Sequence, residues 1–182
     1  LLDLAGLRPE MAAGHSLGEY TSCYLAGAIN LETLVYLVST RGGAMYSHKE
    51  GRGAMAAISA PIEEIEKTLK QVEGYVIIAN RNCPAQSTIS GEAEAVKEAC
   101  ELIQQQGYDA LLLPISVAFH SKMVAPISDK IYAMRNSVSV GQINFPIQSN
   151  VTGDFYPDDV PFSESFWDLI SRHVASPVQF ME

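Results

Sequence analysis

The sequence has 182 residues, of which 47% are hydrophobic and 18% charged, so we expect a globular protein with one sizeable core, or one core and a smaller lobe. Twelve basic and 21 acidic residues give a formal net charge of −9. This charge disfavours nucleic acid and anionic membrane as partners, because both require a positive surface. No apolar run is long enough to span a bilayer. The irregular spacing of Cys23, Cys83 and Cys100 predicts neither a zinc site nor a disulfide framework, which is typical of a cytoplasmic protein.

The first third of the chain predicts short elements around a Gly-x-Ser-x-Gly segment at 14–18. After the end of a helix at 1–7, an apolar run at 11–13 predicts a short strand. Helices are predicted at 18–26 and at 31–46, and Asn30 is placed to cap the second of them.

The central serine of that segment, Ser16, lies between Gly14 and Gly18 in a strand–turn–helix context. This context is that of a nucleophile elbow, in which glycines let strand and helix pass closely and the serine hydroxyl is exposed on a tight turn. Free N–H groups at the start of the following helix would suit an oxyanion. Alternatively, Ser16 only caps the helix, and the pentapeptide alone does not decide between the two.

Arg41 stands on the apolar face of the second predicted helix, at helical spacing from Leu34, Leu37 and Val38, and Met45 continues the stripe. A guanidinium there must extend to solvent, meet a carboxylate or bind an anionic ligand. Extension to solvent is the commoner outcome.

The middle of the chain predicts a self-contained unit at 54–116. Its strands are expected at 54–59, 75–79, 86–90 and 109–113, and its helices at 61–71 and 90–106. This βαββαβ order is ferredoxin-like. We therefore expect a small lobe inserted between 1–53 and 117–182, which form the large lobe. The second part of the large lobe predicts helices at 123–135 and 166–174 and a strand at 145–148.

A serine nucleophile needs a base, and His120 is favoured among the four histidines because it stands in a loop between an apolar strand and a helix. His15 should point away from its neighbour Ser16, His48 lies in a polar loop, and His173 lies on a predicted helix. No acidic residue stands out as a third member of a triad. A backbone carbonyl could orient the imidazole instead, because it only has to accept a hydrogen bond from Nδ1–H.

Four segments then stand in an order shared with one known family: GHSLGEY at 14–20, RGGAM at 41–45, VAFHS at 117–121 and SPVQF at 176–180. The chain resembles the malonyl-CoA:acyl carrier protein transacylases and the acyltransferase domains of polyketide and fatty acid synthases. The resemblance implies an α/β fold, with a hydrolase-like large lobe built on a parallel sheet and an inserted ferredoxin-like small lobe. The family's N-terminal Gly-Gln-Gly segment is not found, so we expect an acyltransferase that is incomplete at both ends.

The resemblance implies that Ser16 attacks the malonyl thioester and carries the acyl group as an ester. His120 would be the general base and then the acid that protonates the leaving thiol. The backbone N–H of Leu17 would be one donor of the oxyanion hole.

The resemblance also implies that Arg41 pairs with the free malonyl carboxylate and that Met45 walls the pocket. Phe119 resembles the malonyl-selecting members, since its ring would leave little room for an α-methyl group. Val117 stands where such members often have histidine. The family orients its histidine with a main-chain carbonyl, which falls at or close to His173.

These roles imply transfer of a malonyl group from coenzyme A to the phosphopantetheine thiol of an acyl carrier protein. The coenzyme A thioester would be a substrate, with no bound cofactor or metal, and the expected partners are malonyl-CoA and the carrier protein. One alternative is a hydrolase that releases acyl groups from carrier proteins, and another is a scaffold domain with a vestigial elbow. Basic residues that could face an acidic carrier protein, or simply form a solvated helix face, are Lys122, Lys130 and Arg135.

Overall fold

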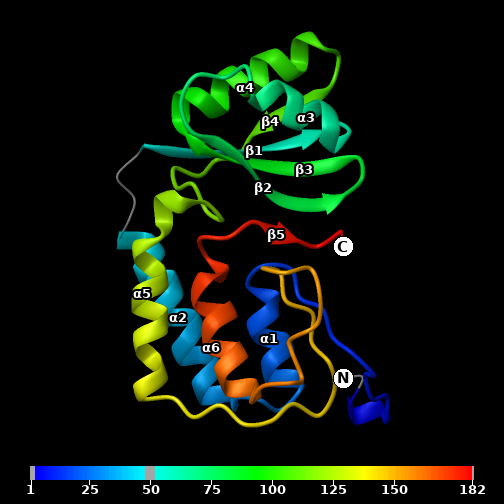
Figure 1. Ribbon diagram of the computed structural model, residues 1–182, viewed down its shortest axis with the longest axis vertical. Coiled ribbons are helices and arrows are strands. Elements are labelled where there is room, and N and C mark those ends of the chain that lie inside the picture. Colours follow the sequence, from blue (N-terminus) through cyan, green and yellow to red (C-terminus); the bar gives the residue numbers. More distant parts are fainter. Residues whose placement is uncertain (1–2, 48–51, 182) are drawn as a thin grey trace.

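The computed structural model describes residues 3–47 and 52–181, so the predicted loop position of His48 lies outside the described residues. The chain forms a sheet covered by two helices and, below it in Figure 1, a group of helices. Each part has its own cluster of buried hydrophobic side chains. Within the described residues, no helix is long and apolar enough to cross a membrane.

The sheet unit has the predicted βαββαβ order. Its elements are β1 (Gly53–Ser59), α3 (Ile62–Leu69), β2 (Val76–Cys83), β3 (Gln86–Glu92), α4 (Ala93–Gln105) and β4 (Asp109–Leu112). Four strands pair antiparallel in the order β4-β1-β3-β2, and α3 and α4 cover one face (Figure 1). The isoleucines Ile58, Ile65 and Ile89 are fully buried between the sheet and its helices.

The helical unit contains α1 (Gly18–Leu25), α2 (Leu31–Ser47), α5 (Pro126–Ala133) and α6 (Phe162–His173). Asn30 caps α2 as predicted, because its Oδ1 accepts a hydrogen bond of 2.8 Å from the Thr33 N–H. Phe166 and Ile170 of α6 are fully buried in the core of this unit.

Two prolines change the predicted helix bounds. The predicted helix at 123–135 is divided into a 3₁₀ turn at Lys122–Val124, α5 from Pro126, and a second turn at Met134–Asn136. Proline has no N–H to donate and therefore suits a helix start. For the same reason α6 begins directly after Pro161, earlier than predicted.

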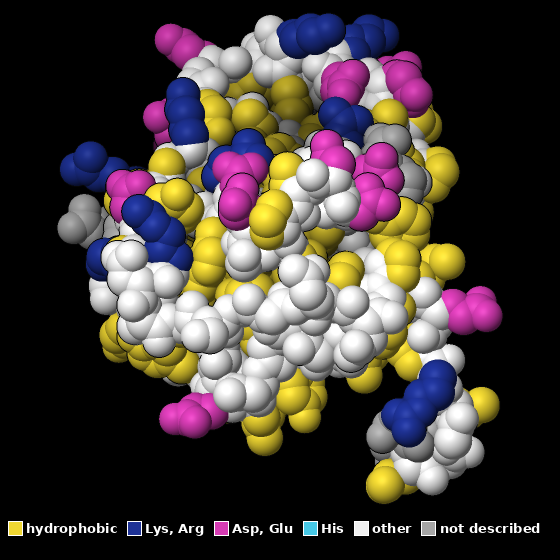
Figure 2. All heavy atoms as spheres, turned by 60° about the horizontal axis from the view of Figure 1, so that its bottom comes forward, with side chains coloured by type: hydrophobic (Ala, Val, Ile, Leu, Met, Phe, Trp, Pro, Cys, Tyr) yellow, Lys and Arg dark blue, Asp and Glu magenta, His cyan; other side chains and the backbone are white. Residues whose placement is uncertain are grey.

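Of the predicted helix at 1–7, residues 1 and 2 lie outside the described residues, and the described part forms only a 3₁₀ turn, Asp3–Ala5. This segment lies apart from the body of the molecule in both views (Figures 1 and 2). On the face shown in Figure 2, basic and acidic side chains lie next to one another in the upper half, and few charged side chains lie in the lower half.

The predicted strands at 11–13 and 145–148 are reduced to one parallel bridge, between Ala12 and Ile147. The Ala12 N–H donates to the Pro146 carbonyl (3.0 Å), and the Gln148 N–H donates to the Ala12 carbonyl (2.9 Å). Among the described residues this bridge is all that represents the parallel sheet expected in the large lobe. It nevertheless fixes the chain just before the Ser16 turn.

A strand that the sequence did not predict is β5 (Val178–Gln179), which pairs parallel with Asn80 and Arg81 of β2. The C-terminal segment thus leaves α6 and becomes the fifth strand of the sheet, between the two units in Figure 1. The lobe boundaries at residues 53 and 117 stay a prediction.

Candidate active site

Ser16 lies on a turn between the Ala12 bridge and the start of α1. Its φ is 49°, and among the described non-glycine residues only Ser16 and His120 (φ 56°) have a positive φ. Such a conformation costs on the order of 1 kcal/mol or more and persists only where the surroundings hold it. Ser16 does not cap α1, because the N-cap position is Leu17 and no side chain bonds there. The elbow interpretation therefore describes the turn, and the capping alternative is wrong.

Of the two flanking glycines, only Gly14 is required by space. A Cβ at Gly14 would lie 2.1 Å from the carbonyl carbon of Gly18, far inside van der Waals contact. A Cβ at Gly18 would have no atom within 4 Å. The close approach expected of both glycines thus holds for the first one alone.

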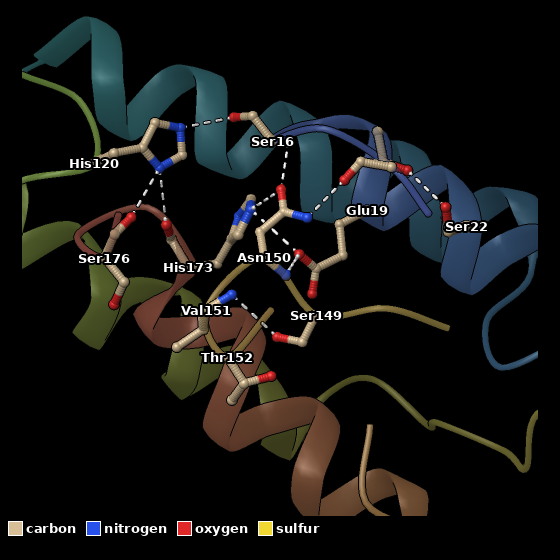
Figure 3. A network of polar contacts seen from close by, with 12 residues as sticks. Ser16, Glu19, Ser22, His120, Ser149, Asn150, Val151, Thr152, His173 and Ser176 are labelled. Carbon is tan, nitrogen blue, oxygen red and sulfur yellow. Dashed lines mark hydrogen bonds and ion pairs between the residues drawn. The ribbon is translucent and has the colours of Figure 1, made fainter. Parts of the chain in front are cut away.

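The nucleophile candidate contacts its predicted base directly. Ser16 Oγ lies 2.8 Å from His120 Nε2 (Figure 3). On the other side of the ring, His120 Nδ1 lies 3.1 Å from the carbonyl oxygen of His173 and 3.1 Å from that of Ser176. Two carbonyls can only accept, so Nδ1 carries the proton and Nε2 is free to accept the serine proton. These two backbone carbonyls lie on the side of the ring where a catalytic triad would have its carboxylate.

The His120 ring is buried, with 4% of its surface exposed. Burial and, to a lesser extent, the positive charge of Arg41 lower its pKa, the hydrogen bonds to the two carbonyls oppose that shift, and the net result is a pKa of about 4. The ring is therefore neutral at physiological pH, as a general base must be.

This depressed pKa predicts an unusual pH profile for Ser16. Only the neutral ring accepts the serine proton, so the rate of Ser16 labelling by a fluorophosphonate should be lost as the pH falls through about 4. At pH 5.5 the rate should still be about nine-tenths or more of its plateau, whereas a histidine with the usual pKa of 6.5 would leave about a tenth. Circular dichroism at each pH checks that the fold is intact. An inflection between pH 6 and 7 would contradict the prediction.

Arg41 on α2 is buried, with 4% exposed, and does not extend to solvent. Its Nη2 donates to Ser16 Oγ (3.1 Å), and its guanidinium lies 5.6 Å from the centre of the Tyr20 ring. Its buried Nε has no hydrogen-bond partner, and no carboxylate within the described part of the chain comes within ion-pairing distance. Burial lowers its pKa, and nearby Tyr20 and Glu19 oppose that shift. Within the described residues, the site thus holds a buried cation that no carboxylate pairs with.

The remaining predicted site residues surround this centre less closely. The amide of Leu17 has no hydrogen-bond partner in the described chain, and its side chain is exposed. Met45 and Phe119 are partly buried and pack against the core of the helical unit. The roles of these three residues stay predictions. His15 points away from Ser16, since its Nε2 lies 2.8 Å from Asn82 Oδ1.

A buried polar cluster beneath Ser16 was missed by the sequence analysis. Asn150 Oδ1 accepts a hydrogen bond from the Ser16 N–H (2.6 Å), and Asn150 Nδ2 donates to the Gly14 carbonyl (2.9 Å). Glu19 accepts hydrogen bonds from the Tyr156 hydroxyl (2.6 Å) and from the Asn150 N–H (2.9 Å). Glu19 stands within the predicted motif, but a glutamate in the first turn of a helix is ordinarily exposed, so nothing in the sequence marked it.

Burial governs the charge state of this cluster. It raises the pKa of Glu19 to about 7, although hydrogen bonds from Tyr156 and Asn150 lower it, and it lowers the pKa of His173 well below its usual value. Both shifts disfavour a charged pair. We therefore regard the 3.4 Å contact between His173 Nε2 and Glu19 Oε2 as a polar contact and not as an ion pair.

No group of three or more His, Cys, Asp or Glu side chains in residues 3–47 and 52–181 is arranged to hold a metal ion. The functional groups that meet at the site are the Ser16 hydroxyl, the His120 imidazole and the Arg41 guanidinium.

Comparison with known proteins places this geometry in context. Residues 1–182 match the family model described as acyl transferase domain. The malonyl CoA-acyl carrier protein transacylase of Bacillus subtilis (strain 168) is 33% identical, with 98% of the chain and 57% of that protein covered. The Mycoketide-CoA synthase of Mycobacterium tuberculosis is 35% identical over 100% of the chain and 4% of its own length. A solved malonyl CoA-acyl carrier protein transacylase from Clostridium perfringens is 36% identical with a TM-score of 0.91, covering 98% of the chain and 57% of that protein. The chain thus spans little more than half the length of these transacylases.

Proposed function

Because the chain belongs to the acyl transferase domain family, we propose that Ser16 accepts a malonyl group from coenzyme A and passes it to the phosphopantetheine thiol of an acyl carrier protein. The observation that carries the proposal is the pair of contacts at Ser16 Oγ, 2.8 Å to His120 Nε2 and 3.1 Å to Arg41 Nη2. A base and an unpaired cation on one hydroxyl suit transfer of an acyl group that bears its own carboxylate.

Transfer would occur in two steps. His120 Nε2 accepts the Ser16 hydroxyl proton while Oγ attacks the thioester carbonyl, and the proton then passes to the departing coenzyme A thiol. The carrier thiol next attacks the serine ester, gives its proton to His120, and Ser16 Oγ recovers that proton as it leaves. In both steps the carbonyls of His173 and Ser176 hold the imidazolium, and the unpaired Leu17 amide is available to the oxyanion.

Arg41 would select the malonyl group. A guanidinium already in contact with the nucleophilic oxygen can reach a carboxylate on a short acyl chain, and its planar fork suits a bidentate pair. The transacylases similar to this chain carry malonyl in their names. Met45 would wall the pocket. The Phe119 ring would disfavour an α-methyl group by about 1–3 kcal/mol, which biases the choice of substrate without making it absolute.

The carrier protein would approach from solvent, in the cytoplasm, where the free cysteines of this chain stay reduced. Lys122, Lys130 and Arg135 lie exposed along α5 and its flanking turns. The Lys122 ammonium stacks over the Tyr75 ring (4.1 Å), and the Arg135 guanidinium stacks over the Tyr132 ring (3.9 Å). Cations that are held in place by aromatic rings suit an acidic partner, so α5 and its flanking turns are the candidate docking face for the carrier protein.

Covalent loading tests the proposal. The full-length protein is incubated with malonyl-, methylmalonyl- or acetyl-CoA, and its intact mass is measured before and after addition of a phosphopantetheinylated carrier protein. We expect a malonyl adduct on Ser16 in the highest yield, passed to the carrier and absent in Ser16→Ala. An adduct lost to water as fast as to the carrier would support the hydrolase instead. No adduct with any donor would support the scaffold alternative.

A further inference from the structure

Asn150 clamps the nucleophile turn from beneath. One side-chain amide bonds both ends of the turn, since Oδ1 accepts from the Ser16 N–H (2.6 Å) and Nδ2 donates to the Gly14 carbonyl (2.9 Å). Asn150 is fully buried, so water does not compete for these bonds. The clamp acts on the residue whose backbone is held at a φ of 49°. A left-handed serine needs such support, because the local preference of the chain opposes it.

The clamp is itself fixed from two directions. The Asn150 N–H donates to Glu19 Oε2 (2.9 Å), and the Asn150 carbonyl accepts from the N–H of Gln179 in β5 (2.8 Å). Glu19 Oε1 in turn accepts from the Tyr156 hydroxyl (2.6 Å). Glu19 is fully buried, three residues after Ser16 in the sequence. Its carboxyl group accepts a hydrogen bond from the loop that carries Asn150 and does not face solvent (Figure 3).

His173 joins the same cluster to the catalytic histidine. Its carbonyl accepts from His120 Nδ1 (3.1 Å), while its ring Nε2 lies 3.4 Å from Glu19 Oε2 and 3.4 Å from Asn150 Oδ1. The two imidazole rings meet edge to face, with centroids 5.5 Å apart. Serine and histidine therefore rest on one buried set of side chains, Glu19, Asn150 and His173, although they lie far apart in sequence.

We propose that Asn150, held in place by Glu19, is a positioning residue that sets the backbone of Ser16 so that its hydroxyl meets His120. Its amide acts on the backbone of the turn, since Oδ1 accepts from the Ser16 N–H and Nδ2 donates to the Gly14 carbonyl. Without the amide, the Ser16 N–H loses its hydrogen-bond partner and the turn can relax, which moves Oγ away from Nε2. The inference rests on the proposed serine chemistry but not on the identity of the acyl group or of the acceptor.

The test compares Asn150→Ala with Ser149→Ala, a matched control. Ser149 is the neighbouring residue, equally buried, and its hydroxyl accepts from the Val151 N–H (3.2 Å), away from the turn. The first readout is the rate of Ser16 labelling by a fluorophosphonate, which needs neither malonyl-CoA nor carrier. We expect about a 10²-fold loss in Asn150→Ala, because a displacement near 1 Å of a reacting atom has an effect of that size, and less than about a threefold loss in Ser149→Ala.

The second readout separates positioning from a structural or binding role. In malonyl loading, the maximal rate should fall in Asn150→Ala while the half-saturating malonyl-CoA concentration changes less than about twofold. Thermal unfolding identifies variants that do not fold. If Asn150→Ala does not fold, Asn150→Asp replaces it. This variant keeps the acceptor for the Ser16 N–H and loses the donor to the Gly14 carbonyl. We then expect Ser16 to be labelled, but more slowly than in the parent protein.

A folded Asn150 variant that labels as fast as Ser149→Ala would overturn the inference. So would a variant whose loss lies entirely in the half-saturating concentration. If instead the parent protein is labelled by the fluorophosphonate but takes up no malonyl group, the proposed function fails and the positioning role stands.

Discussion

Replacing His120 with alanine is expected to slow acylation of Ser16 by about 10²–10⁴-fold, the usual contribution of a positioned general base. The imidazole nitrogen lies 2.8 Å from the hydroxyl that it must deprotonate, and burial keeps the ring neutral at the working pH. No other imidazole contacts Ser16 Oγ within the described residues. Rapid-quench loading with malonyl-CoA, followed by intact-mass measurement at pH 7.5, gives the rate.

His15→Ala is the matched control for this experiment. His15 precedes Ser16 directly in sequence, but its ring bonds Asn82 of β2 and packs against Phe180 (centroids 5.2 Å apart). We expect less than about a threefold change in the acylation rate. Equal losses of acylation rate in both variants would mean that His120 is not the specific base for Ser16, and the mechanism proposed above would be wrong.

Replacing Arg41 with alanine is expected to change which acyl group is accepted. Removing one member of a buried charge pair costs about 3 kcal/mol, so kcat/KM for malonyl loading should fall about 10²-fold. Acetyl loading should stay level or rise. An acetyl group has no carboxylate that could pair with Arg41, so with this donor the buried guanidinium only adds a desolvation cost, which the alanine removes. Competition between malonyl-CoA and acetyl-CoA, read by intact mass, measures the ratio directly.

Arg172→Ala serves as the control for Arg41, since it removes an exposed guanidinium on α6 that pairs with Asp168 (2.6 Å). Neither donor should be affected by it. A parallel loss of malonyl and acetyl loading in Arg41→Ala would mean that Arg41 supports Ser16 in general, and unchanged malonyl loading would exclude the carboxylate role.

Helices and strands could be predicted from the sequence wherever they are long enough to show a periodic pattern of side chains. The succession of strand, helix and turn segments at 54–116 predicted the βαββαβ unit, and the structure has its strands in the order β4-β1-β3-β2. Predictions failed where an element is too short for a period. Residues 11–13 and 145–148 form only one bridge, and β5 is two residues long, held by bonds to β2 and Asn150 that no local pattern reveals.

By itself, the sequence determined which residues carry the candidate chemistry, because the Gly-x-Ser-x-Gly turn, an arginine on an apolar stripe and a loop histidine are local signals. Only the tertiary structure decided how they act. It brought His120 to Ser16, turned Arg41 inward, and placed Glu19, Asn150 and His173 beneath both. The physical reason is that a buried polar group needs a hydrogen-bond partner, and this partner determines how the group is held. Ser16 and Glu19 both bond Asn150, which lies more than a hundred residues away along the chain. Hydrogen bonds across that separation leave no spacing in the sequence to detect.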